Sequence, residues 1–505
     1  MSADTSDGLP CEGAAHPPKP DEAGKPQPSL RGQFFRYMPS QVLPAVTAVV
    51  FLPIITRMFS PSEFGTYSLL LNAVALTDIL TAQWLALAVM RYLPQMRWSR
   101  ADVGAVALAT SIALGLCAGL MGVLLVALIP SWRSQIILAW AACSMLCTRG
   151  ILNVLMPGAQ VQDRSTLFSV VVNIQHIGGY LLALALASRL GVSSLIFGPS
   201  IVEFFLIPIV VWLVFGRLRL PPWKRTKEIL STFARYGLPL AFGGLGGWGT
   251  RMSGRYIVGA FHGLREAGLY SASYDVASRA ITMGAVVLQV TARPRLINTW
   301  EKEGQESTRA LFGKLARLYI IFAVPVVFGC GLLARPMFAI LVDPEYLEAH
   351  TVLVWVCLGT AFTAIQFLLQ FPLQLLERTK IIPVINIGGC IANVALNLLL
   401  VPRFGYIAAA VTTLVTYMGL AIVMAIAARR AFTWPFPTAS TVRVTLASLG
   451  LMLTIPPAVK NLTHPAAEVG VGFVVGVLTY GVLLLAWGEF GFPKGNPSGN
   501  SDEAA

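Results

Sequence analysis

Apolar runs of about 20 residues follow one another along most of this chain, separated by short polar segments. The runs fall at approximately 38–58, 66–90, 103–129, 135–156, 166–188 and 193–215, and then at 235–257, 268–291, 317–342, 350–373, 381–401, 406–428, 441–459 and 468–488. A helix of this length crosses the roughly 30 Å of hydrocarbon in a bilayer. The pattern therefore predicts an all-α, polytopic membrane protein of about fourteen transmembrane helices.

Composition supports the same class. Hydrophobic residues make up 55% of the chain and charged residues only 12%, whereas soluble domains carry about 25% charged residues. Six of the seven cysteines lie inside apolar runs, where cysteine is an ordinary small hydrophobe. The sequence contains no Walker A motif, no metal-ligand cluster and no nucleophile–base arrangement, so we expect no cofactor, no metal and no enzymatic activity.

The positive charge follows the predicted topology. With both termini in the cytoplasm, most of the 37 lysines and arginines fall on the cytoplasmic side and only seven fall outside. This asymmetry is the one that orients membrane proteins. It predicts a membrane protein with both termini cytoplasmic, and it argues against nucleic acid as the partner of a chain with net charge +13.

An internal repeat divides the predicted helices. Glu63, Gly65, Tyr67 and Ser68 match Glu266, Gly268, Tyr270 and Ser271 at one constant offset. Repeats with an even number of helices start from the same side and are therefore parallel, with a site between them. The predicted units are a disordered cytoplasmic tail (1–30), a six-helix bundle (31–216), a basic cytoplasmic linker (217–232), a second six-helix bundle (233–430), two extra transmembrane helices (431–490) and a cytoplasmic tail (491–505).

The hairpin from Tyr236 to Arg295 carries charges inside membrane-length helices. These residues are Arg251, Arg255, Asp275 and Arg279. Charges at this depth are costly and usually mark a substrate or ion pathway, so we expect these four to bind an anionic substrate. Alternatives remain open: Arg251 or Arg255 snorkels to the interface, or Asp275 and Arg279, one turn apart, form a structural pair.

Three other ionisable residues lie within predicted helices. Asp78, Glu203 and His176 are candidates for ion coupling, because a carboxylate in this environment is expensive unless it is protonated or paired. The alternative is a helix–helix contact, which we favour for Glu203 and His176. A glycine run, 243–249, lacks the P-loop lysine and favours close approach of helices.

Several segments resemble the Wzx-type polysaccharide flippases of the MATE-like (MOP) transporter superfamily. They are ITRMFSPSEFGTYSLL (55–70), RYIVGAFHGLREAGLYSASYDVASR (255–279) and NVALNLLLVPRFGYIAAAVTTLVTY (393–417). The resemblance implies two six-helix bundles around a central cationic cavity. It also implies alternating access that moves undecaprenyl-diphosphate-linked oligosaccharide to the outer leaflet for surface or exported polysaccharide. Gly254 departs from the family, whose members often carry an acidic residue there.

Other functions share parts of this pattern. A MATE-type ion-coupled drug exporter has the same implied fold but would favour acidic, aromatic sites. A membrane glycosyltransferase or polymerase usually needs a sizeable external loop, and the predicted external loops are short; a non-transporting scaffold is a further alternative. For the flippase, we expect membrane lipid and the lipid-linked oligosaccharide as partners, with glycosyltransferases and a polymerase in the same pathway.

Overall fold

The computed structural model describes residues 30–489, and within this range every regular element is a helix. Apart from Leu30, the two predicted tails lie outside the described residues. Ten segments are long and apolar enough to cross a membrane. The all-α membrane fold predicted from the apolar runs is thereby confirmed.

The first half of the chain begins with α1 (Leu30–Met58). The second crossing is α2 (Pro61–Asp78) and α3 (Trp84–Tyr92), joined by a π-helical turn at Ile79–Gln83; α4 (Arg100–Leu128) and α5 (Ile136–Val161) follow. Next come α6 (Ser165–Asn173), a π-turn at Ile174–Gly178 and α7 (Gly179–Leu190), and then α8 (Ser194–Val210) with a final π-turn at Val211–Phe215. Single π-turns are rare and are often found at functional sites.

The second half contains longer helices with breaks. Its elements are α9 (Trp223–Leu332), α10 (Ala334–Leu341), α11 (His350–Leu375), α12 (Ile381–Ala431), α13 (Thr438–Val459) and α14 (Pro465–Ala486). Gly263 and Gly304 divide α9 into three limbs, and Gly405 divides α12. All three glycines have positive φ, at 88°, 83° and 65°, a conformation that only glycine adopts readily.

The count of fourteen transmembrane helices stays a prediction, and the ten candidate spans are roughly consistent with it. Two of the spans, Ser165–Phe215 and Ile381–Arg430, are 51 and 50 residues long. Each exceeds the length needed for one crossing, and each contains a glycine with positive φ, Gly191 or Gly405. Such spans are long enough to cross twice, so ten is a lower bound for the described chain.

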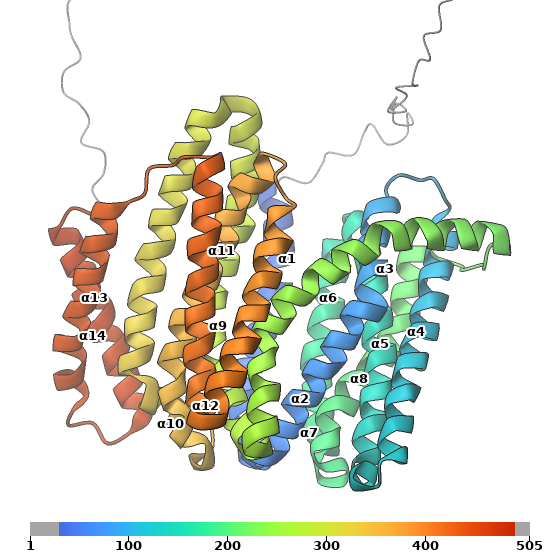
Figure 1. The fold of residues 1–505 in the computed structure, drawn as a ribbon, viewed down its shortest axis with the longest axis horizontal. Helices are drawn as coiled ribbons and strands as arrows, with labels where there is room; N and C mark the ends of the chain where they lie inside the picture. Colours follow the sequence, from blue (N-terminus) through green and yellow to red (C-terminus); the bar gives the residue numbers. More distant parts are fainter. Residues whose placement is uncertain (1–29, 490–505) are drawn as a thin grey trace, which may run out of the picture.

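The helices form two groups (Figure 1). We call α2–α8 the N-lobe, and α10–α14 with the second and third limbs of α9 the C-lobe. The helix α1 contacts α6 and α10, one helix of each lobe. The first limb of α9 begins over the N-lobe at the upper end in Figure 1 and descends to the lower end of the molecule. The predicted domain boundaries themselves stay a prediction.

Specific contacts hold the start of α9 on the N-lobe. Arg97 pairs with Glu228 at 2.8 Å, and Arg225 pairs with Asp102 at 3.1 Å. Phe233, with Ile229 and Ala241 of the same limb, is buried in a core whose other members come from the N-lobe. The first limb of α9 therefore belongs to both lobes, with its basic start on one lobe and its lower part beside the other.

At the lower end, the two copies of the sequence repeat pack against each other. A Cβ atom on Gly65 would stand 2.0 Å from the carbonyl oxygen of Leu264, and one on Gly268 would stand 1.8 Å from that of Pro61. Only glycine permits backbones to approach so closely. Glu63, the third residue of α2, forms a capping box with Ser60 at the start of that helix. The repeat thus builds the contact between the lobes at this end.

Candidate functional site

The four charges predicted for the site lie deep along the first two limbs of α9. Counted from the break at Gly263 with 1.5 Å per residue, Arg251 lies about 18 Å and Arg279 about 24 Å along its limb. The second limb begins at this break rather than at Gly268. Arg279 therefore lies further from the lower turn than its place in the predicted run 268–291 gives.

Asp275 pairs with Arg255, and not with Arg279, the partner that the alternative of a structural pair one turn apart would give it. The Arg255 guanidinium donates to Asp275 Oδ1 at 2.7 Å and to Ser68 Oγ at 3.0 Å, and it lies over the ring of Tyr274 at 4.9 Å. Arg255 is only 4% exposed, so it does not snorkel. Asp275 and Arg279 lie one turn apart on the surface of one helix, where a pair gains little, whereas Arg255 meets Asp275 in a buried, low-dielectric contact.

Arg251 and Arg279 form no ion pair with any carboxylate in the described part of the chain. Arg251 is exposed and lines a cavity, and its side chain lies back along its own helix, 3.5 Å from the position of a Cβ on Gly247. Arg279 is half-buried and close enough to Tyr67, Tyr180 and His176 to act on them electrostatically. Arg279 therefore belongs to the C-lobe but acts on N-lobe residues.

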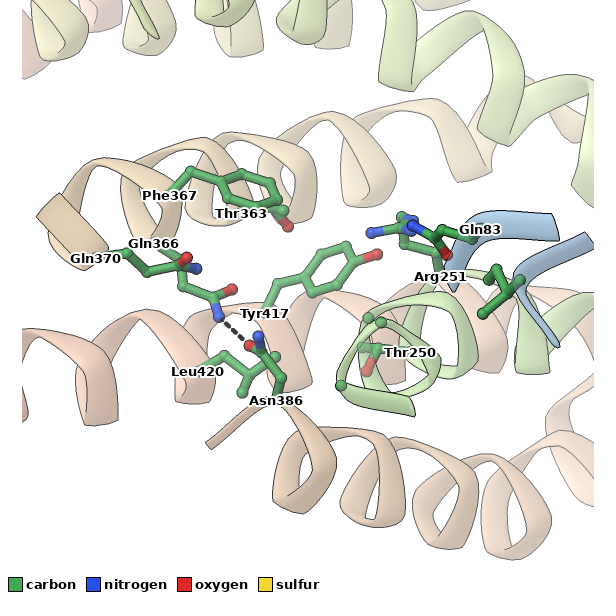
Figure 2. A pocket seen from close by; sticks show the side chains of 14 residues that line it. Gln83, Thr250, Arg251, Thr363, Gln366, Phe367, Gln370, Asn386, Tyr417 and Leu420 are labelled. Carbon is green, nitrogen blue, oxygen red and sulfur yellow. Dashed lines mark hydrogen bonds between the residues drawn. The ribbon is translucent and has the colours of Figure 1, made fainter. Parts of the chain in front are cut away.

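The cavity beside Arg251 has a volume of about 270 Å³ (Figure 2). Four carboxamide side chains line it, and we call it the carboxamide cavity after them: Gln83, Gln366, Gln370 and Asn386. Gln366 donates to Asn386 at 2.8 Å. Residues from both lobes meet here, because Gln83 ends the π-turn of the second crossing while the other three come from α11 and α12. None of these four was singled out from the sequence.

The glycine run of α9, residues 243–249, packs against α12 on one side of the helix and lines the carboxamide cavity on another. Gly246 packs tightly on Asn386 and Ile387 of α12, and a Cβ on Gly249 would stand 2.3 Å from the sulfur of Cys390. This confirms the predicted close approach of helices. On the other side, Gly243, Gly244 and Gly247 line the carboxamide cavity. The absence of side chains there leaves the space that the cavity occupies.

A second cavity, of about 190 Å³, lies within the N-lobe, and we call it the N-lobe cavity. Its polar lining comprises Tyr67, Arg149, Gln175, His176 and Tyr180. The side chain of Arg149 is 29% exposed, and Arg279 acts electrostatically on three of the five lining residues. Arg149 therefore places positive charge in the lining of this cavity, and Arg279 of the C-lobe lies near it.

Glu203 is fully buried beside the N-lobe cavity and accepts three hydrogen bonds. The donors are Thr148 at 2.7 Å, Arg149 at 3.1 Å and Gln175 at 2.8 Å. A buried carboxylate needs such partners to remain charged. The charge asymmetry of the sequence places Arg149 among the cytoplasmic charges, but this residue lies halfway along α5. Its place inside an apolar run was the signal that could have identified it.

Asp78 and His176 both lie at π-turns. Asp78 ends α2 directly before the first π-turn, and its Oδ2 accepts from Asn153 at 2.8 Å, while its Oδ1 is buried without a hydrogen-bond partner among the described residues. His176 lies within the second π-turn, where Nδ1 contacts the carbonyl of Val172 at 2.9 Å. No group of three or more His, Cys, Asp or Glu suited to a metal occurs in the described residues.

Comparison with known proteins identifies a family and a fold. A family model described as "Polysaccharide biosynthesis protein" matches residues 54–351, more than half of the chain. None of the curated proteins compared with the chain matches it by sequence.

Solved structures share the arrangement of helices. The structure of "Lipid II flippase MurJ, inward closed conformation" matches with a TM-score of 0.74 and 12% identity, over 91% of this chain and 99% of that chain. An inward-facing multidrug resistance MATE family transporter of the MOP superfamily matches with a TM-score of 0.60 and 14% identity, over 78% and 97%. Its outward-facing counterpart gives 0.55 and 13%, over 78% and 93%. At these identities the likeness establishes the fold alone.

Proposed function

Because the chain belongs to the polysaccharide biosynthesis protein family and has the fold of MOP-superfamily transporters, we propose that it is a flippase for lipid-linked oligosaccharide. The cargo is an undecaprenyl-diphosphate-linked repeat unit, which moves from the cytoplasmic to the outer leaflet of the bacterial inner membrane. Glycosyltransferases supply this cargo, and a polymerase consumes it. The protein itself forms and breaks no covalent bond.

The observation that carries the proposal is the pair of arginines without carboxylate partners, Arg251 and Arg279. A charge of this kind in a membrane helix costs about 2.5–3.5 kcal/mol on insertion scales, so its retention calls for a function. A diphosphate is an anion that needs cations when it leaves water, and the planar guanidinium fork binds its oxygens bidentately. We assign the diphosphate to these two side chains.

Arg255 and Asp275 take a different part in the proposal. Their pair, with Ser68 of α2, joins the first two limbs of α9 to the N-lobe near the contact between Gly65 and Gly268. Substrate that enters between the lobes from the upper end would meet this contact as a barrier. We propose that these two residues hold the barrier and reach the substrate only when the lobes rearrange.

The engaged carboxylates argue against a MATE-type exporter of cationic drugs. Among the described residues of the membrane helices, Asp275 pairs with Arg255, Glu203 pairs with Arg149, and Asp78 accepts from Asn153. The groups left for a ligand are guanidinium and carboxamide side chains. Such a lining favours an anionic, hydroxyl-rich cargo over a cation.

We further propose Asp78 as the ion-coupling residue. One of its carboxylate oxygens has no partner among the described residues, which leaves it free to take up a proton. Glu203 and His176 are weaker candidates, since Glu203 is bound by three donors and His176 is tied to its own helix. All three lie near Arg149, since Glu203 pairs with it, His176 lines the N-lobe cavity with it and Asp78 is close enough to interact with its charge. A charge change at one would therefore affect the others.

Substitution of Arg279 tests the proposal. In the parent bacterium, Arg279→Gln should abolish polymer export while the protein still reaches the membrane at normal abundance. Arg279→Lys should restore export only in part, since an ammonium lacks the bidentate fork. Arg403→Gln, at an exposed arginine near the break in α12, is the matched control and should export normally. Normal export by Arg279→Gln would overturn the assignment of the diphosphate.

A further inference from the structure

We propose that the carboxamide cavity binds the first sugar of the cargo, as an uncharged sub-site separate from the arginines that hold the diphosphate. This inference rests on the proposed function and adds to it which part of the substrate the protein recognises. The cavity would select lipid that carries a sugar over bare lipid diphosphate. That selection prevents the transporter from moving the carrier without its glycan.

The chemistry of the lining fits a sugar. Each carboxamide offers one acceptor oxygen and two donor hydrogens, and each sugar hydroxyl is both donor and acceptor. Gln366 and Asn386 use one hydrogen bond on each other and retain the rest of their donors and acceptors. A sugar can therefore replace the water that otherwise solvates these groups, whereas a lipid tail would leave them unsatisfied.

Gln370 and Gln83 are the two carboxamides whose surroundings favour a ligand. Gln370 is only 8% exposed as a residue and lines the cavity, and its polar atoms are not among the buried atoms without a partner, so its carboxamide faces the cavity. The side-chain oxygen of Gln83 is buried and without a partner among the described residues. Buried polar groups are normally hydrogen-bonded. These two residues are therefore poorly explained as links between helices and well explained as ligands for a hydroxyl.

The cavity also has two chemically different ends. Figure 2 shows Arg251 and Gln83 at one end and Gln366, Gln370 and Asn386 at the other, with the ring of Tyr417 between them. Phe367 and Tyr417 present aromatic rings to the same space, and the negative faces of such rings attract the polarised C–H groups of a sugar. A sugar on the carboxamides would thus place its phosphate substituent toward Arg251.

The size of the cavity limits what it can hold. Its volume of about 270 Å³ lies just below the roughly 300 Å³ at which pockets for drug-sized ligands begin. It suits one sugar ring and not a complete repeat unit. The remaining sugars would extend into the space between the lobes, without side chains assigned to them.

Binding to the purified full-length protein in detergent tests the inference. The probes are undecaprenyl diphosphate and the same lipid bearing one uncharged hexose. The unmodified protein should bind the hexose-bearing lipid about tenfold more tightly, which corresponds to about 1.4 kcal/mol. In Gln370→Leu and in Gln366→Leu this ratio should fall to about 1. Gln374→Leu, at an exposed position one turn further along α11, should keep it.

Failure of the inference and failure of the proposed function give different results. Equal binding of both lipids by the unmodified protein would overturn the sugar sub-site. An unchanged binding ratio in Gln370→Leu would overturn it as well, and that result can come only from a variant that folds and binds lipid. Arg279→Gln should weaken binding of both lipids by a similar factor. If neither lipid binds the unmodified protein, or if Arg279→Gln binds both as before, the diphosphate assignment fails and the sub-site fails with it.

Discussion

At the scale of single residues, arginine has different roles at four positions within the helices. Arg149 neutralises Glu203, and Arg255 neutralises Asp275, whereas Arg251 and Arg279 have no carboxylate partner in the described chain. The two pairs lie in buried contacts between helices, where a charge without its partner is strongly destabilising. Of the two arginines without a carboxylate partner, Arg251 lines the carboxamide cavity. Pairing therefore separates structural arginines from candidate substrate ligands.

The Arg255–Asp275 pair predicts a specific pattern of protein abundance. Asp275→Asn should leave Arg255 buried without a counter-charge and cost about 3 kcal/mol of stability, which lowers the amount of protein in the membrane. The double variant Asp275→Asn with Arg255→Gln should recover abundance, because it removes both charges. Quantitative blotting of membranes provides the measurement. Full abundance of the single variant would contradict the assignment of a structural pair.

Asp78 predicts a change in the pH dependence of transport. If this carboxylate exchanges a proton during the cycle, Asp78→Asn cannot do so, and transport should lose its dependence on pH while abundance stays normal. Reconstituted vesicles with an imposed proton gradient supply the measurement. The same pH profile in the variant and the unmodified protein would reduce Asp78 to a packing contact with Asn153.

At the scale of elements, a buried acid secures the two C-terminal helices. Glu489 follows α14 and is 3% exposed; its Oε1 accepts from Arg317 of α9 at 2.8 Å, and its Oε2 accepts from Arg443 of α13 at 3.1 Å. Burial by itself raises the pKa of this carboxyl, but hydrogen bonds from Ser440, Arg443 and Arg317 outweigh it and hold the pKa below its ordinary value of 4.5. One carboxylate thus fastens three helices together.

This clamp predicts a pH-dependent loss of stability. Glu489→Gln should lower the free energy of unfolding by about 1–3 kcal/mol, the range for a hydrogen bond to a charged group. Because the folded protein holds the charged form, the contribution is present above about pH 4.5 and is lost as pH falls through the depressed pKa. Thermal unfolding of both proteins at neutral pH and below pH 4.5 tests it. A difference in midpoint that does not shrink in acid would refute the electrostatic explanation.

At the scale of the whole molecule, the two lobes meet through the repeated motif. The close contact of Gly65 with the backbone at Leu264, and of Gly268 with that at Pro61, leaves no room for side chains. The pair of Arg255 with Asp275 and Ser68 lies beside this contact. The proposed alternating access would require this end to separate, and glycine contacts would separate without the loss of a buried side chain. The repeat therefore supplies a contact that is tight but reversible.

The charge asymmetry predicts the orientation of the whole molecule in the membrane. Reporter fusions within 216–232 and 293–316 should read cytoplasmic, and fusions within 262–266 and 460–465 should read external, because loops rich in lysine and arginine remain inside. Figure 1 shows the start of α9 at the upper end and the α13–α14 connection at the lower end, which agrees with this division. A single loop with reversed orientation would break the fourteen-helix topology.

The sequence by itself determined the class of the protein, and it predicts the topology, through properties that are local to the chain. The length and apolarity of each run decide whether a helix can cross a bilayer, and the charges flanking each run bias its orientation. The repeat and the segments 55–70, 255–279 and 393–417 indicated the family, which the comparison confirmed. None of these signals depends on which helices are neighbours.

Only the tertiary structure decided which groups are paired and which are free. Asp275 could have paired with Arg279 by spacing, yet it pairs with Arg255 across a hairpin, and the partner of Arg149 is Glu203 of another helix. The carboxamide cavity brings Gln83 to Gln366 and Asn386, far apart in the chain. Such contacts depend on how helices rotate and pack, because burial and partnership are properties of a residue's neighbours in space and not of its position in the sequence.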